Sequence, residues 1–278
     1  MSSAAVTVVL SGGGAKTAAH LGAHRALREA GLIPARYVAT SMGAVLAAGL
    51  ASGVTEDVLF ERLVEVGRWG IVRDPLATVS GLFSRGLLRP APLRRAFEAL
   101  VPARRFAELQ VPLTVSVVDL DSGELLLFGD HGMDAPLIDV LCASCALPLY
   151  FPPLIVAGRR CGDGGLRGVL PLETASRLAV DPVVAVDVGS GFERLEDGRP
   201  RWVPPVVRAH EDALSILMAA NTATQLALWR AEPGRPALLY IRPRVDRHAT
   251  FQVENVRRYA EDGYRAAGEV IQQWRAET

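Results

Sequence analysis

The sequence predicts an α/β fold with a largely parallel central sheet flanked by helices. An apolar, β-branched run at 6–10 is followed by a glycine turn and a helical segment at 18–30, and a second such run at 37–40 is followed by a helical segment at 43–51. Parallel strands need helical crossovers, so this alternation is typical of a parallel sheet. Half of the 278 residues are hydrophobic, which is enough for one large core.

Each early element has its own justification. Residues 6–10 are short and β-branched, as expected of a buried strand, and the helix at 18–30 ends at Gly31. The segment at 43–51 is expected to form a helix almost without polar groups. Two later runs joined by Asp-Ser-Gly, at 113–118 and 124–128, predict a hairpin. The remaining expected elements are a buried strand at 183–188, a helix at 206–229, a strand at 237–242 and a helix at 251–274.

We expect a single domain over 1–278, because no linker, repeat or low-complexity tract interrupts the chain. Its core should span about 5–190, with a C-terminal extension of helices and a strand, about 191–278, packed on it. The 30 basic and 30 acidic residues cancel, so no nucleic-acid partner is expected. The apolar run at 6–10 is too short for a signal peptide or a membrane span.

The three cysteines are an odd number in a chain that needs no disulfides, which indicates a reducing, cytoplasmic compartment. Cys142 and Cys145 form a Cys-x-x-Cys pair, but no second pair or histidine cluster completes a zinc site. We therefore expect small buried hydrophobes and no metal.

An arginine-rich stretch at 85–105, interleaved with leucine and phenylalanine, has two interpretations. It could cover the active site and make a transient, peripheral contact with an anionic membrane surface. It could instead be an ordinary solvated helix face, which is the commoner role of such a pattern and the one we favour.

Three consecutive glycines, Gly12, Gly13 and Gly14, lead into the first helix, and the only lysine, Lys16, follows them. Without Cβ atoms, the backbone N–H groups of such a turn can surround an anion at a helix N-terminus. The anion is either a bound phosphate or an oxyanion that forms during a reaction.

Ser41 lies at a strand-to-helix junction that leaves no room for a loop, as in a nucleophile elbow. Gly43 allows the following helix to pack close to the turn, whereas Ala39 replaces the usual first glycine of this motif. Taken alone, Ser41 is better interpreted as a helix N-cap. With the glycine turn upstream, the nucleophile interpretation gains, because acyl transfer needs a nucleophile and N–H donors facing one point.

Asp163 lies among Gly162, Gly164 and Gly165. Local signals favour an Asp-Gly hairpin turn. None of the five histidines has a context suited to activating Ser41, so Asp163 is the better candidate for a general base.

Together these segments resemble the patatin-like phospholipases, serine acyl hydrolases with a Ser-Asp dyad. The resemblance implies a three-layer α/β architecture, a lipid or acyl-ester substrate and no cofactor. It also implies that Ser41 and Asp163 form the dyad. The matching segments are 12–16 with 19–22, 40–43, and the block from 143 to 171. The implied oxyanion-hole residues are Gly13, Gly14, Ala15 and Lys16, and the supporting residues are Gly12, Gly43, Gly164 and Gly165.

Three positions depart from the family pattern: Ala39, Thr17 and Val169. They motivate an alternative in which the chain is a catalytically silent relative that binds lipid or acyl groups. A nucleotide-binding alternative is weaker, because a phosphate loop needs glycines where Ala15 and Leu10 stand.

Overall fold

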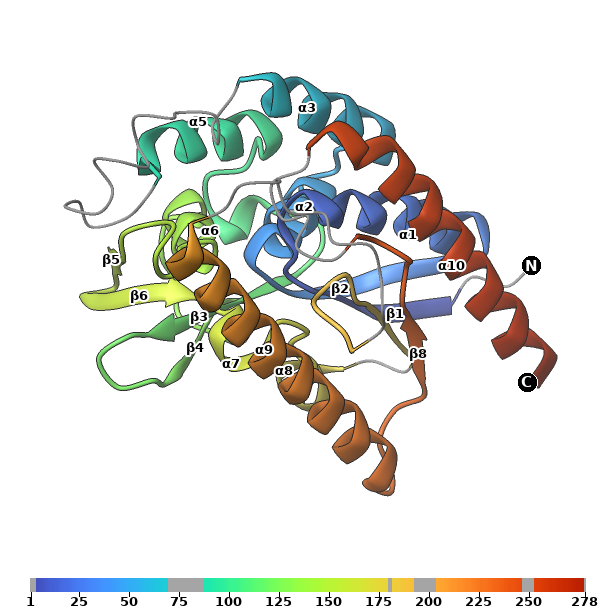
Figure 1. Ribbon diagram of the computed structural model, residues 1–278. Helices are drawn as coiled ribbons and strands as arrows, with labels where there is room; N and C mark the ends of the chain where they lie inside the picture. Colours follow the sequence, from blue (N-terminus) through green and yellow to red (C-terminus); the bar gives the residue numbers. More distant parts are fainter. Residues whose placement is uncertain (1–3, 70–87, 180–181, 193–203, 247–252, 278) are drawn as a thin grey trace.

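The structure is a computed structural model that describes residues 4–69, 88–179, 182–192, 204–246 and 253–277. Its centre is an eight-stranded mixed sheet in the order β5-β6-β3-β2-β1-β7-β8, with β4 also paired to β3 (Figure 1). The strands are β1 (Ala4–Leu10), β2 (Leu32–Thr40), β3 (Leu113–Asp119), β4 (Leu125–Gly129), β5 (Leu154–Val156), β6 (Arg159–Asp163), β7 (Val183–Val186) and β8 (Leu238–Ile241).

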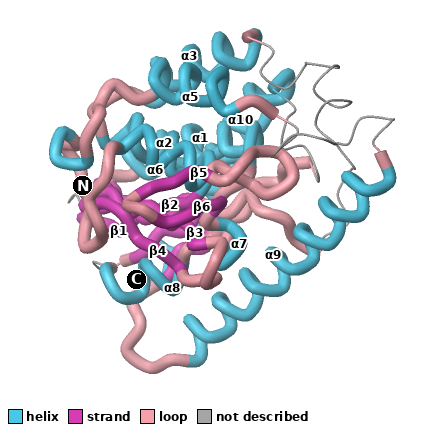
Figure 2. The backbone as a smooth tube through the Cα atoms, turned by 90° about the vertical axis from the view of Figure 1, so that its left-hand side faces the viewer, coloured by secondary structure: helices cyan, strands magenta, loops and turns pink. Residues whose placement is uncertain are grey.

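Helices cover both faces of the sheet, which gives three layers (Figure 2). One face is covered by α1, α2, α3, α5, α6 and α10, and α8 and α9 pack on the other. The α-helices are α1 (Ala18–Glu29), α2 (Ser41–Ala51), α3 (Glu56–Arg68), α5 (Pro90–Leu100), α6 (Leu137–Ser144), α7 (Gly165–Gly168), α8 (Leu172–Leu178), α9 (Pro205–Ala231) and α10 (Val256–Glu277). The short 3-10 helices are η1 (Gly14–Thr17), η2 (Phe106–Glu108) and η3 (Val253–Asn255).

The predicted α/β fold class is confirmed. Strands β3, β2, β1, β7 and β8 run parallel to one another, whereas β4 and β6 pair antiparallel with β3, and β5 pairs antiparallel with β6. The predicted hairpin at 113–118 and 124–128 is the β3–β4 pair. The helix expected at 206–229 is α9, and the one expected at 251–274 corresponds to η3 and α10.

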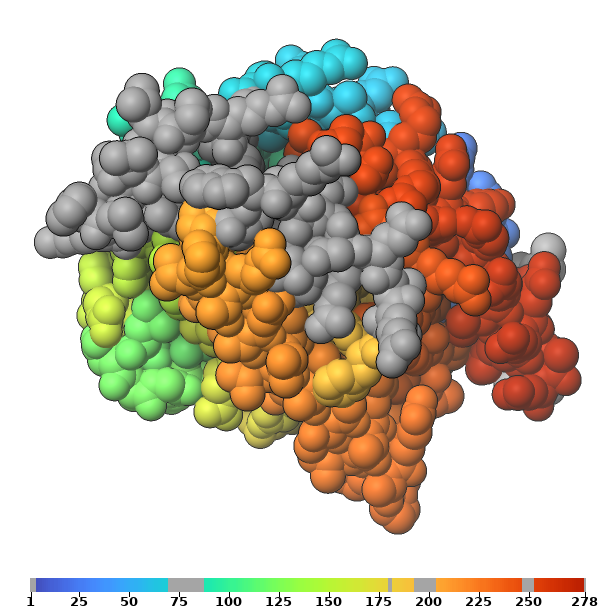
Figure 3. Space-filling view, viewed as in Figure 1, coloured from blue at the N-terminus to red at the C-terminus, as the bar shows by residue number. Residues whose placement is uncertain are grey.

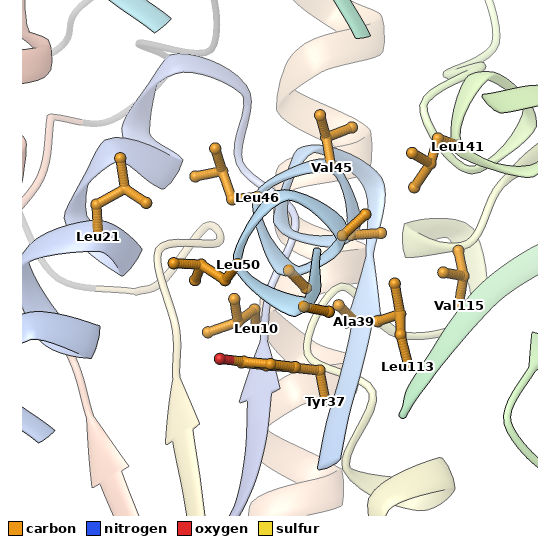
Figure 4. Close-up of a cluster of buried hydrophobic side chains, with 14 of the residues drawn as sticks. Leu10, Leu21, Tyr37, Ala39, Val45, Leu46, Leu50, Leu113, Val115 and Leu141 are labelled. Carbon is orange, nitrogen blue, oxygen red and sulfur yellow. The ribbon is translucent and has the colours of Figure 1, made fainter. Parts of the chain in front are cut away.

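Side chains alternate between the two faces of the sheet, as the pleat of a strand requires. On β1, Val8 and Leu10 enter the larger core beneath α1 and α2, whereas Val9 faces the smaller core beneath α8 and α9. Helix α2 runs through the larger core, where Leu46 and its neighbours pack around Leu10 (Figure 4). Burying each such side chain contributes about 1.5–3 kcal/mol, so α2 is firmly held against the sheet.

A second hairpin, β5–β6, was not expected from the sequence. Its two-residue turn is Ala157-Gly158, with φ of 49° and 76°, which suits the tight turns that join antiparallel strands. The hairpin interpretation of Asp163-Gly164 is therefore wrong: Asp163 is the last residue of β6, and Gly164 leads into α7.

The described part of the arginine-rich stretch supports the solvated interpretation at Arg94. Its guanidinium forms ion pairs with Asp139 at 2.5 Å and with Glu98 at 3.2 Å on the exposed side of α5. Arg85 and its apolar neighbours Leu82, Phe83 and Leu87 lie outside the described residues. All three cysteines are buried and free. Among the helices of the described residues, none has the length and apolarity to cross a membrane.

Candidate active site

The geometry of the sheet brings Ser41 and Asp163 together from positions 122 residues apart. Strand β4 occupies one edge of β3, and both β2 and β6 pair along the other. Thr40, the last residue of β2, pairs with Ser116, and Asp163, the last residue of β6, pairs with Val117. Because β2 runs parallel and β6 antiparallel to β3, their ends meet beside two successive residues of one strand.

The two side chains are hydrogen-bonded. Ser41 Oγ donates to Asp163 Oδ2 at 2.8 Å, and the backbone N–H of Gly165 donates to Asp163 Oδ1 at 2.8 Å. Ser41 has φ of 52°, a conformation that costs a non-glycine residue energy and that turns its hydroxyl out of the strand. The sharp strand-to-helix turn that the sequence predicts at Ser41 is therefore present.

Close backbone contacts explain the glycines on either side of this pair. A Cβ at Gly43 would lie 2.3 Å from the Ser11 carbonyl oxygen, and one at Gly164 would lie 2.3 Å from the Ser116 carbonyl oxygen. A Cβ at Gly12 would lie 3.0 Å from Ser41 Cβ. Side chains at these positions would push the helix and loop away from Ser41 and Asp163.

A small cavity of about 100 Å³ opens at Ser41 and Asp163. Three glycine-loop residues and Lys16 form one side of it, and helix α9, which lies on the surface in Figure 3, forms another. Ala15 is not among the lining residues; it is 8% exposed and packs in the core. The lining residues are Gly12, Gly13, Gly14, Lys16, Ser41, Leu147, Tyr150, Asp163, Gly165, Val169, Gly189, Ser190, Glu211, Leu214, Ser215 and Met218.

Burial makes Asp163 a stronger base than an ordinary aspartate. The residue is 4% exposed, and desolvation raises its pKa to about 6, although the hydrogen bonds from Gly165 and Ser41 act in the opposite direction. A carboxylate with this pKa is still ionised at neutral pH and accepts a proton more readily than one near 4. The same burial, together with the charge of Asp163, raises the pKa of the neighbouring Cys145 thiol, so this thiol stays neutral.

The glycine loop is fixed by contacts at its start. The Gly12 N–H donates to the Val169 carbonyl at 2.9 Å, and the Ser11 carbonyl lies 2.8 Å from His20 Nε2. Burial lowers the pKa of His20 to about 4, so the neutral ring donates this bond. The next two residues, Gly13 and Gly14, both line the cavity with their backbone.

Lys16 places a buried amine at the cavity. It is 4% exposed, and desolvation together with the positive charge of Arg242 lowers its pKa to about 8, although Asp187 acts in the opposite direction. Asp187 in turn accepts hydrogen bonds from the Gly189 N–H and from Arg242 of the C-terminal region. The cavity wall at Gly189 is therefore held by a residue that follows β8.

Two of the three departures from the family pattern, Thr17 and Val169, contact the glycine loop. Thr17 Oγ1 donates to the Gly14 carbonyl at 2.6 Å, and Val169 supplies the carbonyl that accepts from Gly12. Ala39 is fully buried in β2. Thr17 and Val169 thus stabilise the glycine loop.

Sequence reasoning missed the contribution of α9 to the cavity. The helix itself was expected, but no local signal says which face of the sheet it covers. The sequence likewise offers no reason to single out Ser144, whose hydroxyl accepts a hydrogen bond from the Ser41 backbone N–H, 103 residues away in the chain.

Known proteins resemble this chain in sequence and in fold. An uncharacterized NTE family protein of Mycobacterium tuberculosis is 30% identical over 235 residues, which cover 80% of this chain and 60% of that protein. The lysophospholipase nte1 of Emericella nidulans is 25% identical over 315 residues, which cover 98% of this chain and 18% of that protein. The chain thus spans about 60% of the first relative and much less of the second.

Among solved structures, VipD from Legionella pneumophila matches with a TM-score of 0.50 and 17% identity, over 96% of this chain and 66% of that one. This likeness shows a shared fold. A family model described as patatin-like phospholipase matches residues 8–176, a segment that contains the glycine loop, Ser41 and Asp163. Since this segment covers more than half of the sequence, the chain belongs to the patatin-like phospholipase family.

Proposed function

We propose that the chain is a lipid acyl hydrolase that cleaves carboxylic ester bonds through an acyl-enzyme on Ser41, with Asp163 as the base. The observation that carries this proposal is the 2.8 Å hydrogen bond from Ser41 Oγ to Asp163 Oδ2 beside the glycine loop. Family membership supports the same reaction class. It also favours an oxyanion over a nucleotide phosphate as the anion at this loop.

In the first half of the reaction, Ser41 Oγ attacks the ester carbonyl carbon while its proton moves to Asp163 Oδ2. Negative charge develops on the carbonyl oxygen, where the backbone N–H groups of Gly13 and Gly14 stabilise it, assisted by the positive charge of Lys16. One such donor is typically worth about 3 kcal/mol in the transition state. The tetrahedral intermediate then collapses, and the leaving alcohol takes the proton from Asp163.

In the second half, water resolves the acyl-enzyme. Asp163 accepts a proton from the attacking water, and the same amides stabilise the second oxyanion. The acid is released, and Ser41 regains its proton. Neither a metal nor an organic cofactor takes part in this scheme.

The substrate proposal, a lipid ester, is supported by the apolar side chains around the nucleophile. Leu147, Leu214 and Met218 line the cavity and provide contacts for an acyl chain. A panel of phospholipids, lysophospholipids and neutral glycerides, scored by released fatty acid, identifies the preferred class.

The test of the reaction is labelling by a fluorophosphonate, which reacts with an activated serine. We expect the wild-type protein to be labelled and Ser41→Ala to be unlabelled. Ser52→Ala is the matched control, because Ser52 lies at the other end of α2, where its hydroxyl donates to the Ala48 carbonyl at 2.6 Å. A folded wild-type protein that resists labelling and hydrolyses no ester in the panel would instead support the silent lipid-binding alternative.

A further inference from the structure

One short segment contacts both members of the proposed dyad. Helix α6 ends at Ser144, and Ser144 Oγ accepts a hydrogen bond from the Ser41 backbone N–H at 2.8 Å. Two residues later, the Ala146 carbonyl accepts a hydrogen bond from the Asp163 backbone N–H at 3.1 Å. The segment 144–146 therefore holds the backbones of two residues from different strand ends: Ser41 directly follows β2, and Asp163 ends β6.

The Ser144 hydroxyl is fully committed to this arrangement. Besides accepting from Ser41, Ser144 Oγ donates to the Ser116 carbonyl at 2.8 Å, and the residue is fully buried. Ser116 is the residue of β3 that pairs with Thr40, directly before the nucleophile. One hydroxyl thus links the backbone at the end of β2 to β3, the strand beside which β6 also ends.

The Ser144 contact satisfies the first backbone amide of helix α2. The N-terminal amides of a helix lack partners within the helix, and a side chain at the N-cap normally accepts from one of them. Here the N-cap residue Thr40 makes no such bond, and its Oγ1 is buried without a hydrogen-bond partner in the described part of the chain. Ser144 takes over this role from a different helix, at the first residue of α2.

The cap acts where the backbone is strained. Ser41 has φ of 52°, and the direction of its hydroxyl toward Asp163 depends on keeping that angle. A hydrogen bond to the Ser41 N–H opposes relaxation of the turn toward an ordinary helix start. The same bond occupies an amide at the nucleophile, so the oxyanion must be stabilised by the glycine loop.

We propose that Ser144 is a positioning residue that holds Ser41 in its strained conformation and keeps its hydroxyl on Asp163. This inference rests on the proposed function and goes beyond it, because it assigns a role to a residue that does not line the cavity. Loss of the Ser144 hydroxyl frees the Ser41 backbone, lengthens the contact between Ser41 Oγ and Asp163, and slows nucleophilic attack. Misplacement of a reacting group by about 1 Å can cost about a hundredfold in rate.

The test compares Ser144→Ala with Ser116→Ala. Ser116 is a matched control, because it is also a buried serine at this point, but its own hydroxyl has no hydrogen-bond partner among the described residues. We expect Ser144→Ala to lower kcat and the fluorophosphonate labelling rate by about tenfold to a hundredfold with little change in KM. We expect Ser116→Ala to remain within about twofold of wild type in both.

A pH profile separates positioning from a loss of stability. The hydrogen bond from Ser41 lowers the pKa of Asp163, so its loss should move the acid limb of kcat/KM to higher pH in Ser144→Ala. A merely destabilised protein would keep the wild-type limb in its folded fraction. Ser144→Thr, which keeps a hydroxyl at this position, should recover most of the rate.

The outcomes are distinguishable. If wild type is labelled and Ser144→Ala is labelled at the same rate with the same acid limb, the positioning role is refuted while the hydrolase proposal stands. Equal losses in Ser116→Ala and Ser144→Ala would also refute it, because they would indicate a general packing effect. If wild type itself is neither labelled nor active, the hydrolase proposal fails first.

Discussion

Gly22 of α1 and Gly263 of α10 lie where the two helices cross backbone to backbone. A Cβ at Gly22 would lie 1.8 Å from the Ala260 carbonyl oxygen, and one at Gly263 would lie 1.9 Å from the Ala19 carbonyl oxygen. The last helix of the chain is therefore packed directly on the first helix, which begins at the glycine loop of the candidate site.

The first prediction follows from this crossing. Gly263→Ala should lower the free energy of unfolding by about 3 kcal/mol, because the methyl group forces the helices apart. Gly268→Ala on the same helix has open space around its Cβ and should instead stabilise the protein by about 0.5–1 kcal/mol through helix propensity. Urea unfolding measures both, and equal effects of the two substitutions would contradict the close-packed crossing.

The second prediction concerns the proposal that 1–278 is a single domain. Removing the extension at 191–278 deletes β8, which pairs with β7, and α10, whose side chains Tyr259 and Ile271 are buried in the core. The remaining chain would expose an unpaired strand edge and the apolar face of α1, so we expect no cooperative thermal unfolding and strong binding of a hydrophobic dye. A truncated protein that melts cooperatively near the wild-type temperature would show that the core folds alone.

The third prediction is a trade between stability and activity at Asp163. Because burial raises the pKa of Asp163 to about 6, the folded state binds its proton more tightly than the unfolded state, and stability falls as pH rises from about 4 to 6. Asp163→Asn should abolish hydrolysis. It should also raise the free energy of unfolding at pH 7.5 by about 3 kcal/mol, since the pKa of Asp163 rises from 3.8 to about 6 and one pKa unit corresponds to about 1.4 kcal/mol.

The same pair of proteins supplies the control for this prediction. At pH 4.5 the carboxyl of folded Asp163 is already protonated, and only the ionisation of the unfolded carboxyl still lowers stability, so the difference between the wild type and Asp163→Asn should shrink to about 1 kcal/mol. A variant that is less stable than wild type at pH 7.5, or that retains full hydrolysis, would argue against an ionised, buried base at this position.

Much of the fold could be predicted because local signals and tertiary structure agree. The strand, glycine turn and helix that begin the chain, and the hairpin at β3–β4, follow from periodicity and turn residues alone. The β5–β6 hairpin was missed because its strands are short and its turn is Ala157-Gly158, a weaker signal than Asp163-Gly164 a few residues later. At Asp163-Gly164, the glycine serves a different purpose from a hairpin turn: the backbone of Gly164 lies so close to Ser116 of β3 that a Cβ would not fit.

The candidate site was less accessible than the fold, for a different reason. Ser41 and Asp163 stand out because glycines surround them, whereas Ser144 is a serine within an apolar helix that carries no local mark of its contact with Ser41. The α9 residues that line the cavity, such as Leu214 and Met218, have the spacing of any amphipathic helix. Which sheet face the helix covers depends on long-range packing, which local patterns do not record.

The last prediction concerns Lys16 and the pH dependence of the reaction. Burial raises the pKa of Asp163 to about 6 and lowers that of Lys16 to about 8, so kcat/KM should be bell-shaped between these values if the base must be ionised and the amine charged. Lys16→Met should remove the alkaline limb, keep the acid limb near 6 and lower kcat at pH 7 by about tenfold, because positive charge beside the oxyanion is lost. Thermal melts at pH 7 should also show a more stable variant, because the folded state binds the Lys16 proton less tightly than the unfolded state does. This destabilisation is fully present below pH 8 and diminishes as pH rises from 8 toward the ordinary lysine pKa of 10.5. Steady-state pH profiles of both proteins check this, and an alkaline limb that persists in Lys16→Met would show that another group sets it.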